Sequence, residues 1–204
     1  MNHLNNLTDV EKFISTTDLT TLKRDELLEL NLITDELKRR KLQGECRENF
    51  LTFVRTMWSS FIEGAHHRIM CEQFNKIAKG ELKRVIINMA PRHSKSEMSS
   101  YMLPSWLLGI RPDLKIIQAT HTGELAVRFG RKVRDLVDTR EYKEIFPNVS
   151  LRADSKAAGR WETTEGGEYF ASGVGGAITG RGADILIIDD PHSEQDALSE
   201  TAME

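Results

Sequence analysis

The residues most able to do chemistry begin with an octapeptide in the middle of the chain, Met89-Ala90-Pro91-Arg92-His93-Ser94-Lys95-Ser96. It follows the apolar segment 84–89, which predicts a short buried strand, and it precedes residues 97–109, which have a helical pattern. Backbone N–H groups and the helix dipole at such a helix start favour a bound phosphate. Lys95 would then place its ammonium against the β- and γ-phosphates, and the Ser96 hydroxyl would bind Mg²⁺.

The usual phosphate-loop pattern has glycine at the two places that Met89 and Ser94 hold here. Glycine is common there because it permits close backbone approach and unusual dihedral angles. An ordinary basic turn between a strand and a helix is therefore the alternative, and the loop alone does not decide between the two.

A second chemical segment, Ile185-Leu186-Ile187-Ile188-Asp189-Asp190, ends an apolar strand with two carboxylates. Such a strand delivers Asp189 to the carboxyl edge of a sheet, where ligands bind in open α/β folds. Asp189 is the candidate Mg²⁺ ligand, and Asp190 is the candidate group that polarises the attacking water, with Glu194 as a substitute. The alternative is that the acidic pair only starts the turn at Pro191.

Helical and strand patterns alternate along the rest of the chain. Residues 1–44 predict a helical appendage, with Thr8 and Glu11 at capping-box spacing and Gly44 as the stop. Later segments predict further elements: helices over much of 45–79 with a break at Gly64, a strand over 114–120, a helix from Gly123 to about Asp138, and short strands within 150–183. The alternation favours a mainly parallel sheet covered by helices on both faces.

Composition excludes several classes of protein. A net charge of −3 over 204 residues is not that of a basic nucleic-acid coat, so DNA contact would need a local patch or assembly into a ring. The two cysteines, Cys46 and Cys71, lie far apart and predict no disulfide scaffold. The start of the chain is polar, and no run approaches the roughly 18 apolar residues of a membrane span, so we expect a soluble intracellular protein.

Two clusters of basic and imidazole side chains have simple interpretations. The run Lys38-Arg39-Arg40-Lys41 fits the solvated end of a helix, with a DNA or partner contact as the alternative. His66 and His67 are adjacent, and adjacent residues on a helix point in different directions, so we expect no metal-binding role for them.

Several blocks in order resemble the large terminase subunits of tailed bacteriophages: PRHSKSE, LPSWLLG, LKIIQATHTGELAVRFGRKVRDL and GGEYFASGVGGAITGRGADILIIDDP. The resemblance covers roughly residues 50–196. It implies an α/β fold similar to P-loop NTPases, with an N-terminal helical appendage over 1–44 and an ATPase domain over 45–204. It also implies that this domain is incomplete at its C-terminus and that the family's nuclease domain is absent.

The resemblance implies ATP and Mg²⁺ as cofactors and assigns roles to residues. Lys95 and Ser96 match the divergent Walker A motif, in which Arg92 fits the early arginine, and residues 91–96 would line the nucleotide. Asp189 and Asp190 match Walker B. Arg181 is the candidate arginine finger, with a solvated arginine in a tight turn as its alternative. Gln73 matches loosely the place of the adenine contact.

The implied activity is ATP-driven translocation of viral DNA into a procapsid. The implied partners are double-stranded viral DNA, the portal protein, the small terminase subunit and further copies in a ring, in the host cytoplasm and with no membrane. One rival is another P-loop DNA-dependent ATPase of helicase type. A second rival, which the absent glycines and Asp190 favour, is a non-catalytic or truncated assembly module that binds portal or DNA.

Overall fold

The computed structural model describes residues 4–176 and 178–192, which form two compact units. The first unit ends at Cys46 and the second begins at Arg47. Each unit has its own buried apolar residues, so each is described by itself. No helix among the described residues is long and apolar enough to cross a membrane.

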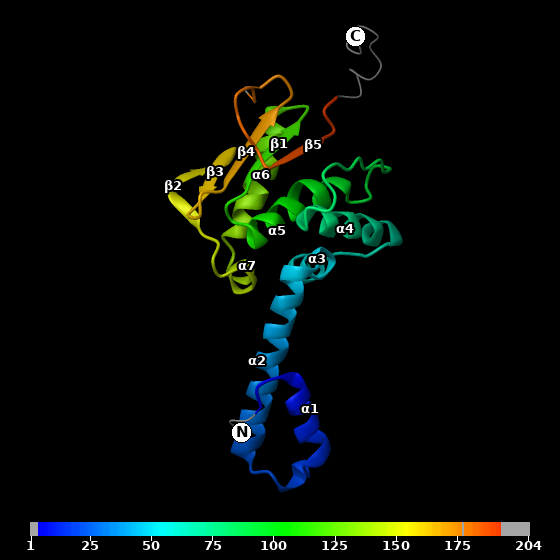
Figure 1. Ribbon diagram of the computed structural model, residues 1–204, viewed down its shortest axis with the longest axis vertical. Helices are drawn as coiled ribbons and strands as arrows, with labels where there is room; N and C mark the ends of the chain where they lie inside the picture. Colours follow the sequence, from blue (N-terminus) through cyan, green and yellow to red (C-terminus); the bar gives the residue numbers. More distant parts are fainter. Residues whose placement is uncertain (1–3, 177, 193–204) are drawn as a thin grey trace. The chain divides into compact units, whose positions relative to one another are not determined.

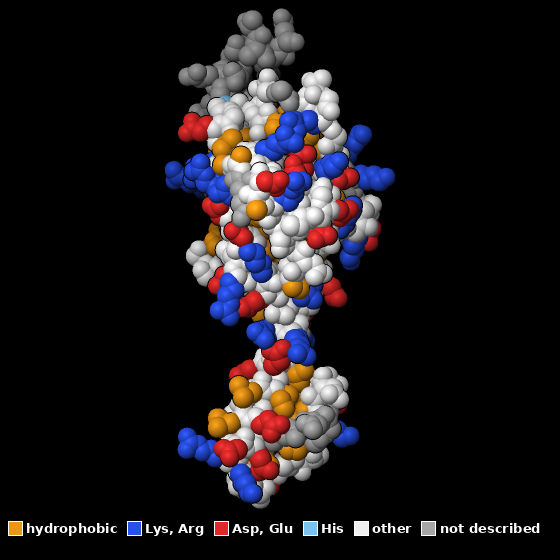
Figure 2. Space-filling model, turned by 90° about the vertical axis from the view of Figure 1, so that its left-hand side faces the viewer, with side chains coloured by type: hydrophobic (Ala, Val, Ile, Leu, Met, Phe, Trp, Pro, Cys, Tyr) orange, Lys and Arg blue, Asp and Glu red, His pale blue; other side chains and the backbone are white. Residues whose placement is uncertain are grey.

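The first unit is helical, as expected. It contains α1 (Leu7–Thr16), the short 3₁₀ helix η1 (Leu19–Thr21) and most of α2 (Arg24–Glu48). Its core consists of Leu4, Val10 and Leu30, against which several partly buried apolar side chains pack. Apolar side chains also remain at its surface (Figure 2), among them Leu28 and Leu32.

Two predicted helix boundaries in this unit are wrong. Helix α1 begins at Leu7, and its N-cap is Asn6 and not Thr8, because the Asn6 side chain accepts a hydrogen bond from the Asp9 N–H at 2.9 Å. Helix α2 continues through Gly44 to Glu48. A glycine inside a helix costs about 1 kcal/mol relative to alanine, and the burial of Cys46 just beyond it favours continuation.

The second unit contains helices that pack around an aromatic core. The helices are α3 (Phe50–Met57), α4 (Ala65–Ala78), the π-helix η2 (Glu97–Met102), α5 (Leu103–Ile110), α6 (Gly123–Val137) and α7 (Arg140–Ile145). Phe50 contacts the rings of Phe53, Phe74 and Trp106, with centroids 5.3–6.5 Å apart. These four side chains are almost completely buried, so they fix α3 and α4 to α5.

A five-stranded mixed sheet lies at the centre of the second unit, in the order β2-β3-β4-β1-β5 (Figure 1). The strands are β1 (Lys115–Thr120), β2 (Leu151–Ala157), β3 (Arg160–Thr163), β4 (Glu168–Gly173) and β5 (Ile185–Asp189). Strand β1 pairs in parallel with both β4 and β5, whereas β2–β3 and β3–β4 are antiparallel. The fold is therefore α/β with a partly parallel sheet, flanked by helices.

Helix α6 covers one face of the sheet at close range (Figure 1). The indole N–H of Trp161 in β3 donates to the Gly130 carbonyl in α6 at 3.1 Å, and the Trp161 ring stacks on Tyr169 of β4. A Cβ at Gly130 would lie 2.5 Å from the Ala158 carbonyl oxygen. Gly130 thus permits the contact between helix and hairpin.

The prediction of a buried strand over 84–89 is wrong. Residues 82–90 have no strand assignment, and the Ile86 side chain is 88% exposed. A strand needs a paired neighbour, and β5, which is the edge of the described sheet, pairs only with β1. An apolar run in a sequence does not show whether such a neighbour is within reach.

Candidate functional site

The predicted phosphate loop is a turn that leads directly into a helix. Residues 91–94 form turns and bends, and helical structure begins at Lys95. Arg92 and Ser94 both have φ of 64°, in the left-handed region that L-residues rarely adopt. Ser94 holds one of the two places where the usual pattern has glycine, and its backbone has the conformation that glycine would supply most easily.

The helix that begins at Lys95 leaves its first N–H groups available. The Met98 N–H donates to the Ser94 carbonyl at 2.9 Å, which closes the first turn, and the Ser99 hydroxyl donates to the Lys95 carbonyl at 2.8 Å. The N–H groups in the turn before Met98 therefore have no partner within the helix. An anion at this helix start would find unpaired donors and the positive end of the helix dipole.

The two carboxylates at the end of β5 meet Lys95. The Lys95 Nζ atom lies 2.5 Å from Asp190 Oδ1 and 3.7 Å from Asp189 Oδ1. Asp189 is buried and accepts a hydrogen bond from the Ser100 hydroxyl at 2.9 Å, whereas the Asp190 side chain is exposed. The structure thus brings together Lys95, Asp189 and Asp190, which the sequence predicted to share one site.

The Lys95 ammonium is held in its charged form. Burial alone would lower its pKa, but the hydrogen bond and charge of Asp190, with the charge of Asp189, outweigh burial and raise the pKa above its usual value. Asp190 itself has φ of 44°, a left-handed conformation that directs the chain into Pro191. The site therefore carries a fixed positive charge beside two carboxylates.

A cavity of about 400 Å³ opens between the loop and Asp190. Its lining includes most of the predicted nucleotide-binding residues, namely Pro91, Arg92, Ser94, Lys95 and Ser96. Among the described residues, the Arg92 guanidinium forms no ion pair or hydrogen bond. Its charge is thus available to an anion in the cavity.

The donors fit a hard divalent cation only if a ligand completes the coordination. Ser96 lines the loop cavity, whereas Asp189 lines a cavity beside β5 that shares Lys95 and Asp190 with it. A carboxylate and a hydroxyl are oxygen ligands of the kind that Mg²⁺ prefers. Among the described residues, no group of three or more His, Cys, Asp or Glu side chains is placed to hold a metal. Phosphate oxygens and water would supply the remaining ligands, as is usual for Mg²⁺ bound with a nucleotide.

A second cavity of about 330 Å³ adjoins the loop and is lined by aromatic side chains. It is lined by Trp58, Ser60, Phe61, Ile62, His66, His67, Arg92, His93 and Ser94. Phe61 stands edge-on to His67, and the Nε2 atoms of His66 and His67 lie 3.1 Å apart. Of these residues, His93 was predicted to bind the nucleotide, whereas Trp58, Phe61, His66 and His67 were not predicted as site residues, although their aromatic character ahead of the loop was a usable signal.

His67 is the buried member of this cluster. Burial lowers its pKa first, and the neighbouring His66 lowers it further, while its Nδ1 accepts a hydrogen bond from the Gly64 N–H at 2.9 Å. His93, whose ring lies 5.5 Å from that of His66, joins the cluster to the phosphate loop. The imidazoles and the two aromatic rings together line this cavity beside the loop.

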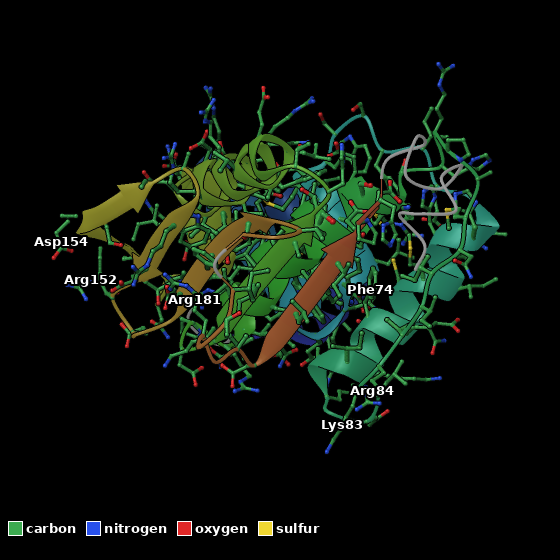
Figure 3. All side chains as sticks on the ribbon, turned by 90° about the horizontal axis from the view of Figure 1, so that it is seen from above. Phe74, Lys83, Arg84, Arg152, Asp154 and Arg181 are labelled. Atoms are coloured by element: carbon green, nitrogen blue, oxygen red, sulfur yellow. The ribbon has the colours of Figure 1, made fainter. Side chains whose placement is uncertain are left out.

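Two predicted site residues lie elsewhere. Gln73 is on α4 and lines neither cavity, whereas its neighbour Phe74 lies beside β5 (Figure 3). Arg181 lies on the other side of β5, where its guanidinium stacks on Phe170 at 3.9 Å and pairs with Glu168 at 3.2 Å (Figure 3). Glu168 is the first residue of β4, so Arg181 is at the opposite end of the parallel strands from Asp189. Glu194 lies outside the described residues.

No protein-family model matches the chain, and no curated protein matches it significantly. The function is therefore proposed from the motif blocks and from the geometry of the site.

Proposed function

We propose that the chain is the ATPase part of a phage DNA-packaging motor, a large terminase subunit with a fold similar to P-loop NTPases. The observation that carries the proposal is the contact of Lys95 with Asp189 and Asp190. Lys95 is at a helix start and directly follows Ser94, whose backbone has a positive φ. A helix start, a lysine and a strand-end carboxylate pair are the parts that phosphoryl transfer needs in this class of ATPase.

Each residue has a defined task in the proposed reaction. Lys95 and the N–H groups of the helix start bind phosphate oxygens, and Arg92 adds a second cation on the same cavity. Ser96 and Asp189 would hold Mg²⁺, and the ion would supply positive charge that neutralises charge on the phosphate oxygens. Asp190, released from Lys95, orients the attacking water and accepts its proton at a carboxylate oxygen.

The aromatic cavity beside the loop has the chemistry for the nucleobase. A purine stacks on aromatic and imidazole rings, and Trp58, Phe61 and His66 line a cavity that shares Arg92, His93 and Ser94 with the phosphate loop. The proposal therefore moves the base contact from Gln73 to these rings.

The proposed partners follow from the same class. They are double-stranded viral DNA, the portal protein, the small terminase subunit and other copies of the chain in a ring, in the host cytoplasm. On the face drawn in Figure 2, basic and acidic side chains of the second unit are interspersed. That mixture fits DNA contact through an assembled ring better than through a single strongly basic surface.

The test is Mg²⁺-dependent binding and hydrolysis of ATP by the chain, beside its Lys95→Ala variant. We expect the parent to bind ATP and the variant to lose binding at least tenfold, because the phosphate charge loses its ammonium partner. Lys143→Ala, which removes a lysine paired with Asp138 outside the cavities described above, is the matched control and should bind ATP as the parent does.

Three outcomes would redirect the proposal. Equal ATP binding by the parent and by Lys95→Ala would show that this loop is not a phosphate site. Binding without turnover, also in the presence of portal and DNA, would favour the non-catalytic assembly module. Stimulation of hydrolysis by DNA but not by portal would favour a DNA-dependent ATPase of helicase type.

A further inference from the structure

Helix α2 carries leucines on two opposite faces. Leu30 is buried in the core of the first unit, and Leu37 packs against that core. Leu28, Leu32 and Leu42 are instead 53%, 71% and 43% exposed. A surface helix of a globular protein normally has one apolar face toward its core and one polar face toward water. The packing of the first unit therefore does not account for the second set of leucines.

The exposed leucines belong to a stripe along one face of α2. The stripe consists of Leu28, Leu32, Asp35, Arg39 and Leu42, all of them exposed, and it is called the α2 stripe below. Its members are four, three, four and three residues apart, which places them on one face over about four turns, or about 21 Å. Alternating steps of three and four residues are the spacing with which one helix contacts another helix.

The two charged members of the α2 stripe lie between its leucines. The Asp35 side chain forms no hydrogen bond or ion pair with any described residue. The Arg39 side chain pairs with Glu36 and is still 56% exposed. A helix that covered the leucines would also cover these two charges, and a covered charge needs a partner of opposite sign. The partner must therefore offer a cation opposite Asp35 and a carboxylate opposite Arg39.

A second copy of α2 meets this requirement when the two helices are antiparallel. Position 37 is midway between Leu32 and Leu42 and also midway between Asp35 and Arg39. A twofold axis at position 37 therefore sets Leu32 against Leu42 of the other copy and Asp35 against Arg39 of the other copy, and each contact occurs twice. In a parallel pair, Asp35 would face Asp35 and Arg39 would face Arg39, which is repulsive.

The charge distribution along the whole of α2 favours the same orientation. Residues 25–36 contain five acidic residues and no basic residue, whereas residues 38–41 are all basic. An antiparallel pair centred at position 37 sets the basic run of each copy beside residues 33–36 of the other, and it opposes the two helix dipoles. The basic run, for which the sequence left a partner contact open, then has a definite place in a contact.

We infer that the α2 stripe is a self-association surface, through which two copies of the chain form an antiparallel pair of α2 helices. The four turns make a contact smaller than a standard protein interface, so we expect a weak dimer that dissociates at about 10–100 µM. A twofold contact closes at two copies and cannot build a ring. The inference is thus separate from the ring of the proposed function and does not depend on nucleotide binding.

The first test is sedimentation equilibrium of the full chain without nucleotide, from about 5 µM to about 200 µM. The parent should show a reversible equilibrium between monomer and dimer. Leu32→Glu should weaken association at least tenfold, because its carboxylate would be covered against Leu42 of the other copy. Leu32 is exposed, so this variant should fold as the parent does. The matched control is Ile69→Glu on α4, where the side chain is 63% exposed and off the α2 stripe, and it should dimerise as the parent does.

A second test exchanges the charges of the stripe. Asp35→Arg and Arg39→Asp should each weaken association at least tenfold, because each sets like charges against one another. The double variant restores opposite charges at both contacts and should dimerise as the parent does. An equimolar mixture of the two single variants should form mixed dimers for the same reason.

Three results would overturn the inference. One is a parent chain that stays monomeric over the whole range of concentration. Another is a dimer that Leu32→Glu leaves intact, which would place the contact elsewhere. The third is a dimer that Leu32→Glu disrupts but that either single charge variant leaves at full strength, because the antiparallel register about position 37 would then be wrong.

Discussion

At the scale of single residues, the phosphate loop obtains its shape without the expected glycines. Ser94 adopts φ of 64°, which costs an L-residue about 1–2 kcal/mol. Strain of this kind persists where the surroundings determine the backbone, and here the helix start at Lys95 and the bond from Met98 to the Ser94 carbonyl do so. The absence of a glycine at position 94 made the sequence prediction of a phosphate loop weaker, but the backbone there still has a positive φ.

Replacing Ser94 by glycine should therefore stabilise the protein. We expect Ser94→Gly to raise the free energy of unfolding by up to about 1 kcal/mol, because relief of strain exceeds the added entropy of the unfolded chain. Urea denaturation at constant m-value measures this change. Ser99→Gly, at a helical position with a hydrogen bond to Lys95, should lower stability by about 1 kcal/mol instead. A loss of stability in Ser94→Gly would show that the serine side chain holds the loop.

His67 should make stability depend on pH. Its pKa in the folded protein is lowered, so below the ordinary histidine pKa of about 6.5 the unfolded chain takes up a proton that the folded chain does not. The stability that neutral His67 contributes is present above that pH and is lost as pH falls toward the lowered pKa. The charge of His66 adds to the lowering of the His67 pKa, whereas the main-chain hydrogen bond with His93 and the charge of Glu63 oppose it.

The measurement is urea unfolding between pH 7.5 and pH 5 for the parent and for His67→Gln. We expect the variant to lose less stability over this interval than the parent does, because glutamine does not titrate. Identical losses would assign the pH dependence to other groups.

At the scale of elements, α6 is positioned by a contact that only glycine permits. An added Cβ at Gly130 would approach the Ala158 carbonyl oxygen to 2.5 Å and the Tyr169 ring to 3.1 Å. The same stretch of α6 accepts the Trp161 indole hydrogen bond. The helix follows directly after β1, so this contact also influences where the carboxyl end of β1 lies beside Asp189.

Gly130→Ala should destabilise the protein by about 1–3 kcal/mol, because the overlap is with main chain that cannot move aside easily. Alanine has the higher helix propensity, by about 1 kcal/mol. The steric overlap therefore lowers stability while the change in helix propensity raises it. Gly44→Ala in α2 isolates the second effect, since nothing lies within 4 Å of its Cβ, and should stabilise by about 0.5–1 kcal/mol. Thermal denaturation measures whether each variant is less stable or more stable than the parent. Stabilisation by Gly130→Ala would mean that the hairpin shifts freely.

Helices and strands were predictable from the sequence where the local residue pattern determines the element. They were not predictable where the element depends on pairing with a distant strand. The apolar runs of β1 and β5 and the amphipathic α6 were predicted correctly within a few residues, since each pattern repeats within the element itself. The segment 84–89 has the same apolar character as β5, and only the lack of a reachable partner distinguishes it. The meeting of Lys95 with Asp189 and Asp190 was foreseen from topology, whereas the aromatic cavity was not, because its residues come from segments without a fixed spacing.

At the scale of the whole molecule, the candidate arginine finger and the phosphate loop lie at opposite ends of the parallel strands. Six residues of β1 separate the two ends, about 17 Å at the usual rise per residue. Arg181 stacks on Phe170 and pairs with Glu168 (Figure 3). Through Arg160, which contacts both Glu168 and Glu162, it belongs to a network of ion pairs that also includes Arg152 and Asp154. In a single chain it does not reach Lys95, so any catalytic contact must be with a neighbouring subunit.

Arg181→Ala should therefore leave ATP binding by the single chain unchanged and should slow hydrolysis in the assembled ring by about 10³-fold or more. Steady-state hydrolysis of the variant on its portal, beside single-chain binding, measures both effects. Arg152→Ala removes an arginine from the same network of ion pairs and should hydrolyse ATP normally. Normal turnover by Arg181→Ala in the ring would show that Arg181 is only a member of this network of ion pairs and not an arginine finger.

The bridge between Lys95 and Asp190 couples the two proposed ligands thermodynamically. A phosphate group that takes Lys95 must displace Asp190, and the displaced carboxylate then lies beside Asp189 with no cation of its own. Two adjacent carboxylates without a counterion repel one another, and a divalent cation relieves that repulsion. Under the proposed function, nucleotide binding would therefore raise the affinity for Mg²⁺, and linkage would require Mg²⁺ to raise the affinity for nucleotide by the same factor. Under the proposed function, the ion pair between Lys95 and Asp190 would thus favour the binding of nucleotide and Mg²⁺ together over the binding of either one alone.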